Sequence, residues 1–195
     1  MTTETWTPGA APPETLDWGP VRLDRWHPED IDDQYAAVDA SREHLAPFMP
    51  WSHGYERASS EWYLADCVRS WTSRTAFNYR VSAPTLAAGP VLGSASLMAR
   101  NGPGSLEIGY WVRADAVRRG IARQASAALT EAGFALPGVE RIEIHHDPAN
   151  EASAGIPAAL RFTRLPDLVP GPPGHEHDLM VCWVVGREDW VPVRG

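Results

Sequence analysis

The sequence lacks the features that mark membrane-bound, secreted and disulfide-stapled chains. It has no apolar run long enough to span a bilayer, and no charged-then-apolar segment at its start that would mark a signal peptide. Its two cysteines, Cys67 and Cys182, lie far apart and show neither a disulfide framework nor metal-ligand spacing. We therefore expect two buried free thiols in a cytoplasmic protein with no membrane partner.

An excess of positive charge is also missing. The formal net charge is −8, which argues against a nucleic-acid partner and is compatible with a cationic substrate. The 195 residues are 44% hydrophobic and 22% charged, as is ordinary for a soluble globular protein, and no internal repeat is apparent. We expect an extended lead-in rich in Thr, Pro and Gly over residues 1–19, followed by a single domain over residues 20–195.

The most informative stretch is a strand, a basic turn and a helix. Leu106–Val112 (LEIGYWV) is apolar almost throughout, as expected of a strand that is buried on both faces. From Ile121 the apolar residues recur with helical spacing. The N–H groups of the turn between them can converge at the helix N-terminus, which suits a phosphate. An exposed basic turn without a ligand is the alternative, because short glycine motifs often match by chance.

This stretch resembles motif A of the Gcn5-related N-acetyltransferases (GNAT), and within them the RimJ/RimL type. In that superfamily a Tyr-Trp-Val-like strand end is followed by an Arg/Gln-x-x-Gly-x-Gly/Ala turn that holds the pyrophosphate of acetyl-CoA. The corresponding turn here is Val117, Arg118, Arg119, Gly120, Ile121 and Ala122. Val117 departs from the usual Arg or Gln, but binding through backbone amides does not depend on that side chain.

Three further blocks extend the resemblance over about residues 20–190. Ser41–Trp51 resembles a family segment that walls the acceptor site, so Trp51 is a candidate acceptor contact; a core-packing connector is the alternative. Asn150–Phe162 resembles the N-x-x-S block that contacts the cofactor, with Arg161 at a position where glycine is usual. The ending Arg187–Trp190 resembles the family's closing R-E-D-W.

Periodicity and turn residues predict the remaining elements. We expect strands over residues 21–26, 75–83, 90–100, 139–145 and 178–185, and helices starting at Pro28 and at Ser59 or Ser60. Residues 84–89 predict a hairpin loop, and the Pro/Gly-rich residues 165–174 predict a loop between the last two strands. Because Gly155 and Pro157 interrupt the helix after Asn150, we expect it to be short or to begin near Pro157.

The resemblance implies an α/β (α+β) GNAT fold, with a mixed, mostly antiparallel sheet of about seven strands flanked by helices. It also implies direct transfer of an acetyl group from acetyl-CoA to a primary amine, without a covalent enzyme intermediate. The acceptor can be either a protein N-terminus or a small-molecule amine, and the protein can be either a monomer or a homodimer. The alternative is an inactive module that senses acyl-CoA, which Val117, Pro157 and Arg161 would favour.

Glu107 is conspicuous as a carboxylate within an otherwise apolar strand. Desolvation favours the protonated form of such a group, which moves it toward useful general-base strength. We expect Glu107 to draw the proton from the acceptor amine, directly or through a water. The alternative is an ion pair with an arginine across the sheet.

The resemblance assigns roles to three more residues. The Val112 N–H, where the family's strand parts from its neighbour, would bind the thioester oxygen as an oxyanion hole does. Asn150 would bond the pantetheine amide, and Ser153 would lie near the sulfur as proton donor or simple hydrogen-bond partner; a helix N-cap is the alternative for Ser153. No tyrosine occurs between Ser153 and Phe162, where other branches of the superfamily have their acid, and this favours Ser153.

Two other chemistries are less well supported. His145-His146-Asp147 and His175-Glu176-His177 suggest a metal, but adjacent strand residues point to opposite faces, so each pair offers at most one inward ligand. We therefore expect no metal. The sequence has no Gly-x-Ser-x-Gly nucleophile elbow, which argues against a serine hydrolase.

Overall fold

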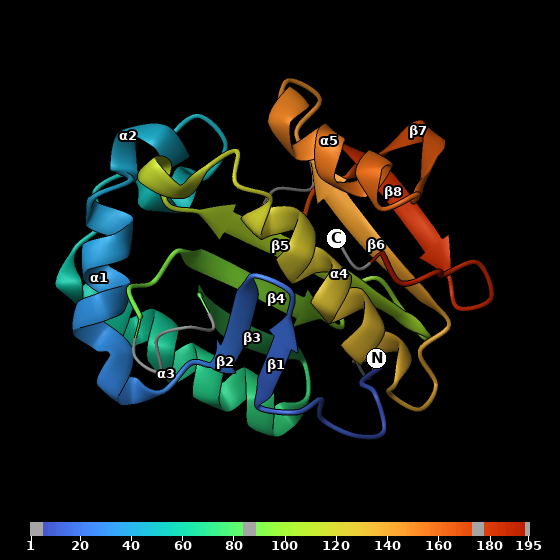
Figure 1. Cartoon of the computed structure of the whole chain (residues 1–195), viewed down its shortest axis with the longest axis horizontal. Helices are drawn as coiled ribbons and strands as arrows, with labels where there is room; N and C mark the ends of the chain where they lie inside the picture. Colours follow the sequence, from blue (N-terminus) through green and yellow to red (C-terminus); the bar gives the residue numbers. More distant parts are fainter. Residues whose placement is uncertain (1–5, 84–88, 173–177, 194–195) are drawn as a thin grey trace, which may run out of the picture.

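The computed structural model describes residues 6–83, 89–172 and 178–193. Its centre is an eight-stranded sheet with the order β1-β2-β3-β4-β5-β6-β8-β7 (Figure 1). All neighbouring strands are antiparallel except β5 and β6, which are parallel. The mixed, mostly antiparallel sheet is thus confirmed, with one strand more than predicted. The strands are β1 (Thr15–Trp18), β2 (Val21–Arg25), β3 (Ala76–Ser82), β4 (Gly93–Met98), β5 (Ser105–Val112), β6 (Arg141–His146), β7 (Thr163–Pro170) and β8 (Leu179–Gly186).

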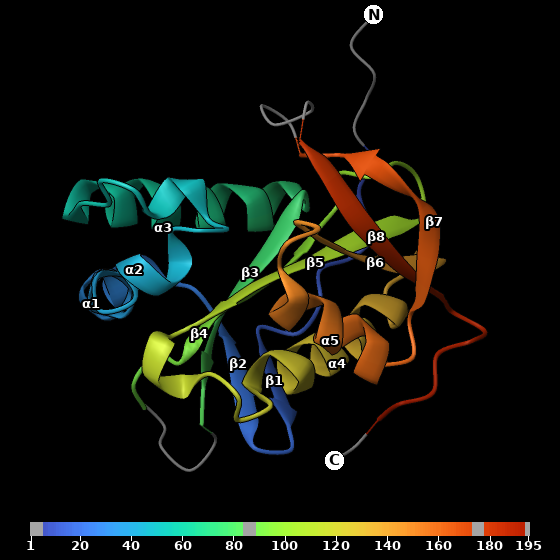
Figure 2. The same cartoon turned by 90° about the horizontal axis from the view of Figure 1, so that it is seen from above.

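Helices cover both faces of this sheet (Figure 2). On one side lie α1 (Ile31–Asp39), α2 (Arg42–Leu45) and α3 (Arg57–Ser73), and on the other α4 (Ile121–Phe134) and α5 (Glu151–Ala159). Three short 3-10 turns accompany them: η1 (Pro28–Asp30), η2 (Pro50–Ser52) and η3 (Ala114–Ala116). Among the described residues, no helix is long and apolar enough to cross a membrane.

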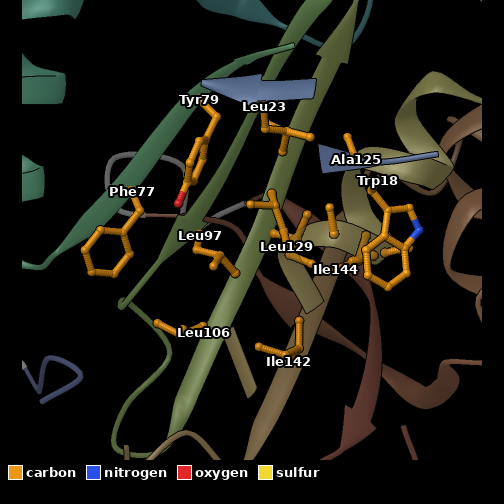
Figure 3. Close-up of a cluster of buried hydrophobic side chains, with 14 of the residues drawn as sticks. Trp18, Leu23, Phe77, Tyr79, Leu97, Leu106, Ala125, Leu129, Ile142 and Ile144 are labelled. Atoms are coloured by element: carbon orange, nitrogen blue, oxygen red, sulfur yellow. The ribbon is translucent and has the colours of Figure 1, made fainter. Parts of the chain in front are cut away.

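The two faces of the sheet differ in chemistry. The face under α4 carries aliphatic and aromatic side chains that form the main core with Ala125 and Leu129 of the helix (Figure 3). The opposite face is more polar: Glu107 of β5 pairs with Met98 on one side and Glu143 on the other. Paired residues share a face, so both carboxylates lie on the α3 side. The apolar face anchors the sheet to α4, and the polar face carries the two buried carboxylates.

Most of the predicted elements are confirmed, because their hydrophobic periods agree with their burial. The strand at residues 21–26, the hairpin strands and the unit formed by β5 and α4 all occur within a few residues of the expected bounds. Residues 84–88 of the expected hairpin loop lie outside the described residues, but β3 and β4 pair antiparallel from Ala76–Met98 to Val81–Gly93.

The prediction of a loop over residues 165–174 is wrong for its first part. Residues 163–170 form β7, which pairs with β8 at the edge of the sheet. The register shifts between Arg164 and Leu168, and Pro166 lies within the shift. Proline is tolerated at a sheet edge and at bulges because its missing N–H is not needed there.

Two smaller differences concern β1 and α5. The segment expected as a lead-in contains β1, which pairs with β2 across a turn at Gly19 and buries Trp18. The helix after Asn150 is short, as predicted, but it begins at Glu151 and keeps Pro157 inside it.

Candidate active site

β5 and β6 are paired over only half of the length of β5. Their parallel ladder joins residues 105–108 to residues 141–144, whereas β5 stays paired with β4 as far as Val112. β6 continues to His146 beside β8. The two strands therefore diverge after Ile108, and residues 109–112 have no ladder partner on the β6 side among the described strands.

The amide of Val112 is directed toward this divergence. The next residue, Arg113, donates its N–H to the carbonyl of Leu92 on the β4 side at 2.8 Å. Successive N–H groups of an extended strand point to opposite edges, so the Val112 N–H points toward β6. On the other edge, the backbones of β4 and β5 lie very close together at Gly93. A Cβ on Gly93 would lie 2.2 Å from the Trp111 carbonyl oxygen, so this position requires glycine.

The turn that precedes α4 leaves the helix N-terminus uncapped. Gly120 is the N-cap residue with φ 76°, a left-handed conformation that favours glycine. A Cβ there would meet only Arg123 Nη2, at 4.0 Å, so the space above it is open. Within the described chain no side chain caps this end, and the first turn contains no acidic residue. The first amides of α4 and the helix dipole are thus available to an anion.

Two arginines flank this turn. Arg118 has φ 59°, a conformation that costs a non-glycine residue about 1 kcal/mol or more and that often marks functional turns. Arg118 and Arg119 are both exposed, and Arg119 donates to the Asp115 carbonyl at 2.7 Å. Val117 and Ala122 are half-buried, and Ile121 is buried. The turn therefore combines open backbone amides with two cationic side chains.

Asn150, and not Ser153, caps α5. The Asn150 side-chain oxygen accepts from the Ser153 N–H at 3.0 Å, which is the hydrogen bond of an N-cap residue. The alternative that Ser153 is the N-cap is therefore wrong. The cap uses Oδ1 as its acceptor. The donor of the same amide, Nδ2, takes no part in this cap.

Tyr110 is a further candidate residue, for which the sequence alone indicates no role. Its hydroxyl lies 2.9 Å from Ser153 Oγ and donates to the Ser153 carbonyl at 3.3 Å. Burial raises the pKa of Tyr110 to about 12, against the effect of the hydrogen bond with Ser153. The sequence offers one signal. Side chains of a strand point alternately to its two faces, so Tyr110 shares a face with Val112, two residues further along, and not with Trp111. The contact itself spans two elements far apart in the sequence and has no sequence signature.

Glu107 forms the ion pair that was considered as the alternative to a free base. Arg100 donates from Nε to Glu107 Oε2 at 2.8 Å and from Nη2 to Oε1, and Asn101 Nδ2 donates to Oε2 at 3.0 Å. The Glu107 side chain is 4% exposed. His145 Nδ1 lies 3.6 Å from the same carboxylate, beside the point where β5 and β6 diverge.

A second buried carboxylate completes this network. Glu143 accepts from Ser105 and Arg141 at 2.7 Å and lies 2.8 Å from His145 Nε2. Burial opposes the charge on both groups. The hydrogen bonds from His145, Ser105 and Arg141 nevertheless lower the pKa of Glu143 to about 2. Hydrogen bonding with Cys182 and Glu143 raises the pKa of His145 to about 10. The two groups are therefore an ion pair at neutral pH.

The histidines considered as metal ligands are separated by the strand, as predicted from its alternation. His145 lies with Glu143 and Cys182, whose ligand atoms are within 4.8 Å of one another. His146 is on the other face, where Nδ1 contacts the Asp147 carbonyl at 2.8 Å and Nε2 accepts from Trp183 at 3.0 Å. Residues 175–177 lie outside the described residues.

Trp51 lies at the α1–α3 side of the same strand end. Its ring centroid is 6.3 Å from that of Trp111 and 5.7 Å from that of Tyr55. Trp111 immediately precedes Val112, and the Trp51 side chain is 43% exposed. These contacts form an aromatic wall that is open to solvent and adjacent to the end of β5.

Comparison with known proteins gives one family. The model of the acetyltransferase (GNAT) domain matches residues 21–163. Among curated proteins, none matches the sequence significantly.

Solved structures share the fold at low identity. RimJ of Mycobacterium smegmatis, in complex with CoA-disulfide, has a TM-score of 0.79 and 20% identity over 97% of this chain and 93% of its own. RimL, a ribosomal L7/L12 alpha-N-protein acetyltransferase in complex with coenzyme A, has a TM-score of 0.76 and 16% identity, with coverage of 89% and 98%. The microcin C7 self-immunity acetyltransferase MccE, in complex with acetyl-CoA and AMP, has a TM-score of 0.74 and 14% identity, with coverage of 86% and 92%.

Proposed function

Because the chain belongs to the GNAT acetyltransferase family, we propose that it binds acetyl-CoA along the divergence of β5 and β6 and transfers the acetyl group to a primary amine. One observation carries this assignment. The uncapped N-terminus of α4, which begins at Gly120, follows directly on the strand whose last residues are left unpaired by β6. A phosphate-binding helix end and free strand amides are therefore available to one extended ligand.

The donor would be held by backbone groups and a few side chains. The amides of residues 117–122 would bind the pyrophosphate, with Arg118 and Arg119 adding positive charge. The Asn150 Nδ2, which takes no part in the cap of α5, would donate to a pantetheine amide oxygen. The bound ligands of the similar structures, acetyl-CoA in MccE and coenzyme A in RimL, support this choice of donor. We propose no metal.

The transfer requires charge stabilisation and two proton movements. The amine nitrogen bonds to the acetyl carbon, and the Val112 N–H stabilises the negative charge on the carbonyl oxygen. We propose that Glu107 takes the amine proton through a water, because its carboxylate is 4% exposed and lies below the surface that an amine can reach. The C–S bond then breaks, and the sulfur is protonated on the side of the sheet where Ser153 lies.

The acceptor would approach from the opposite side, past Trp51. We propose a protein N-terminus as the first acceptor class, because the similar structures include RimL and a ribosomal-protein-S5-alanine acetyltransferase from Vibrio fischeri. A small-molecule amine is the second class. We further propose that residues 20–195, together with β1 from the preceding segment, act as one domain, as a monomer or homodimer in the cytoplasm, where Cys67 and Cys182 stay reduced.

Thiol release from acetyl-CoA tests this function. We would assay the wild-type chain against peptides with N-terminal alanine or serine and against spermidine. Release with one amine class, together with acetylated product in the mass spectrum, is the expected result. Binding of acetyl-CoA without release on any amine would favour a sensor, and absence of binding would contradict the whole assignment.

A further inference from the structure

Tyr110 and Ser153 form a hydrogen-bonded pair across the divergence of β5 and β6. Their hydroxyl oxygens lie 2.9 Å apart. Tyr110 lies in the half of β5 that pairs with β4 but not with β6. Ser153 lies in the first turn of α5, the helix that follows β6. The pair therefore links the two walls of the proposed acetyl-CoA site. Tyr110 also shares a face of the strand with Val112, two residues further along.

Pro157 accounts for part of this contact. In a regular helix the N–H of residue 157 would donate to the carbonyl of Ser153, but proline has no N–H. The Tyr110 hydroxyl donates to that carbonyl instead, at 3.3 Å. With its proton directed there, the phenol oxygen can accept from the Ser153 hydroxyl. The proline that interrupts the family's helix pattern thus creates a second acceptor for Tyr110.

The surroundings of Tyr110 suit a proton donor. Burial keeps the phenol protonated at neutral pH, while the hydrogen bond from Ser153 stabilises the phenolate. A phenol is a much stronger acid than the aliphatic hydroxyl of serine. Of the two hydroxyl groups in this pair, that of Tyr110 is therefore the better donor to a leaving thiolate.

We propose that Tyr110 protonates the leaving sulfur and that Ser153 positions and stabilises it, an inference that rests on the proposed function. After the nitrogen–carbon bond has formed, the charge on the carbonyl oxygen collapses, the C–S bond breaks and its electron pair stays on sulfur. The Tyr110 O–H turns from the Ser153 carbonyl to this sulfur and transfers its proton, and the Ser153 hydroxyl donates to the phenolate that results. Solvent then returns a proton to Tyr110. The proton lost by the amine goes to the base on the other face, so charges and protons balance.

The Tyr110→Phe variant removes the hydroxyl and keeps the ring. We expect kcat to fall about 100-fold, as for loss of a general acid, while the Kd for acetyl-CoA changes less than about twofold. Tyr63→Phe is the matched control, because Tyr63 also pairs with a serine, Ser94 at 3.2 Å, but lies on the α3 side of the sheet. It should retain the wild-type kcat. Ser153→Ala should lose about tenfold, as for one hydrogen bond to a charged group.

A selenoester of acetyl-CoA separates proton donation from packing. A selenol is a much stronger acid than a thiol, so the selenolate leaves without needing a proton. We expect the loss in Tyr110→Phe to shrink to within about threefold with this donor. Binding gives a readout that is independent of turnover: by calorimetry the wild type should prefer CoA over desulfo-CoA by about fivefold, and Tyr110→Phe should lose the preference.

Two results would overturn the inference while leaving the proposed function intact. One is a wild-type kcat in Tyr110→Phe, and the other is an equal loss of kcat with the thioester and the selenoester, which would assign Tyr110 a packing role. If the wild type neither binds acetyl-CoA nor releases thiol with any amine, the proposed function fails, and the inference fails with it.

Discussion

Arg100 and Glu107 are hydrogen-bonded through both oxygens of the carboxylate, although Glu107 lies within the sheet and Arg100 lies after the end of β4. The Arg100 side chain is 31% exposed and that of Glu107 only 4%. The arginine thus compensates a buried charge from the rim of the polar face. A carboxylate held and buried in this way has a fixed position beneath the surface, which is why a water relay to the amine is proposed.

Glu107→Gln should lower turnover without weakening donor binding. The amide keeps the shape of the side chain but cannot accept a proton, so we expect kcat to fall about 100-fold. Calorimetry should give an acetyl-CoA Kd close to that of the wild type. An unaltered pH–rate profile in this variant would remove Glu107 as the base. Glu143→Gln is the comparison on the same face, expected to affect stability more than the pH–rate profile.

The stability of the fold should decrease on the alkaline side of neutrality because of His145. Its pKa is about 10 in the folded chain, against about 6.5 in an unfolded one. The stabilisation is complete below pH 6.5 and is lost as the pH rises toward 10, since the folded state then retains a proton that the unfolded state has released. Unfolding in urea should show a loss on the order of 3 kcal/mol over this range.

His145→Gln should flatten that alkaline decline, because glutamine does not titrate. Glu143 gives the opposite dependence: its pKa is about 2, so its contribution is present above pH 4.5 and is lost as the pH falls toward 2. An alkaline slope in His145→Gln as steep as in the wild type would show that another group is responsible.

Trp51→Ala should affect the acceptor and not the donor. Trp51 is 43% exposed, so its removal costs little core packing, but it takes away the outer part of the aromatic wall beside Trp111. We expect the KM for the acceptor to rise about tenfold, as for loss of an aromatic contact. Trp62→Ala, 66% exposed on α3, is the matched control and should behave as the wild type. Equal KM values in both variants would contradict the acceptor assignment.

The sequence predicted the structure best where the spacing of apolar residues matches the pattern of buried side chains. β5 and α4 could be predicted because an apolar strand and a helical period meet at a glycine turn. The strand over residues 163–170 could not be predicted, because its two prolines are typical of loops. They fit a strand only at the edge of a sheet, and the edge position is not visible in the sequence.

The site was only partly predictable for a related reason. The sequence indicates residues one at a time. Glu107 stands out as a carboxylate in an apolar strand, with an unidentified arginine as its alternative partner, and Asn150 and Ser153 are identified by resemblance, without their partners. The Arg100 contact and the Tyr110–Ser153 pair depend on how separate elements meet, which has no periodic signal in the chain. That Pro157 frees a carbonyl for Tyr110 becomes visible only once both are placed.

Calorimetric titration of acetyl-CoA into the wild type and Gly120→Val tests the pyrophosphate site most directly. Gly120 has φ 76° and open space above it, so a β-branched side chain there would distort the turn and obstruct the amides. Gly54→Val is the control for backbone strain, since Gly54 has φ +61° with nothing within 4 Å and lies outside the turn. We predict binding in the wild type and in Gly54→Val and none in Gly120→Val. Unchanged affinity in a folded Gly120→Val variant would contradict the placement of acetyl-CoA at α4.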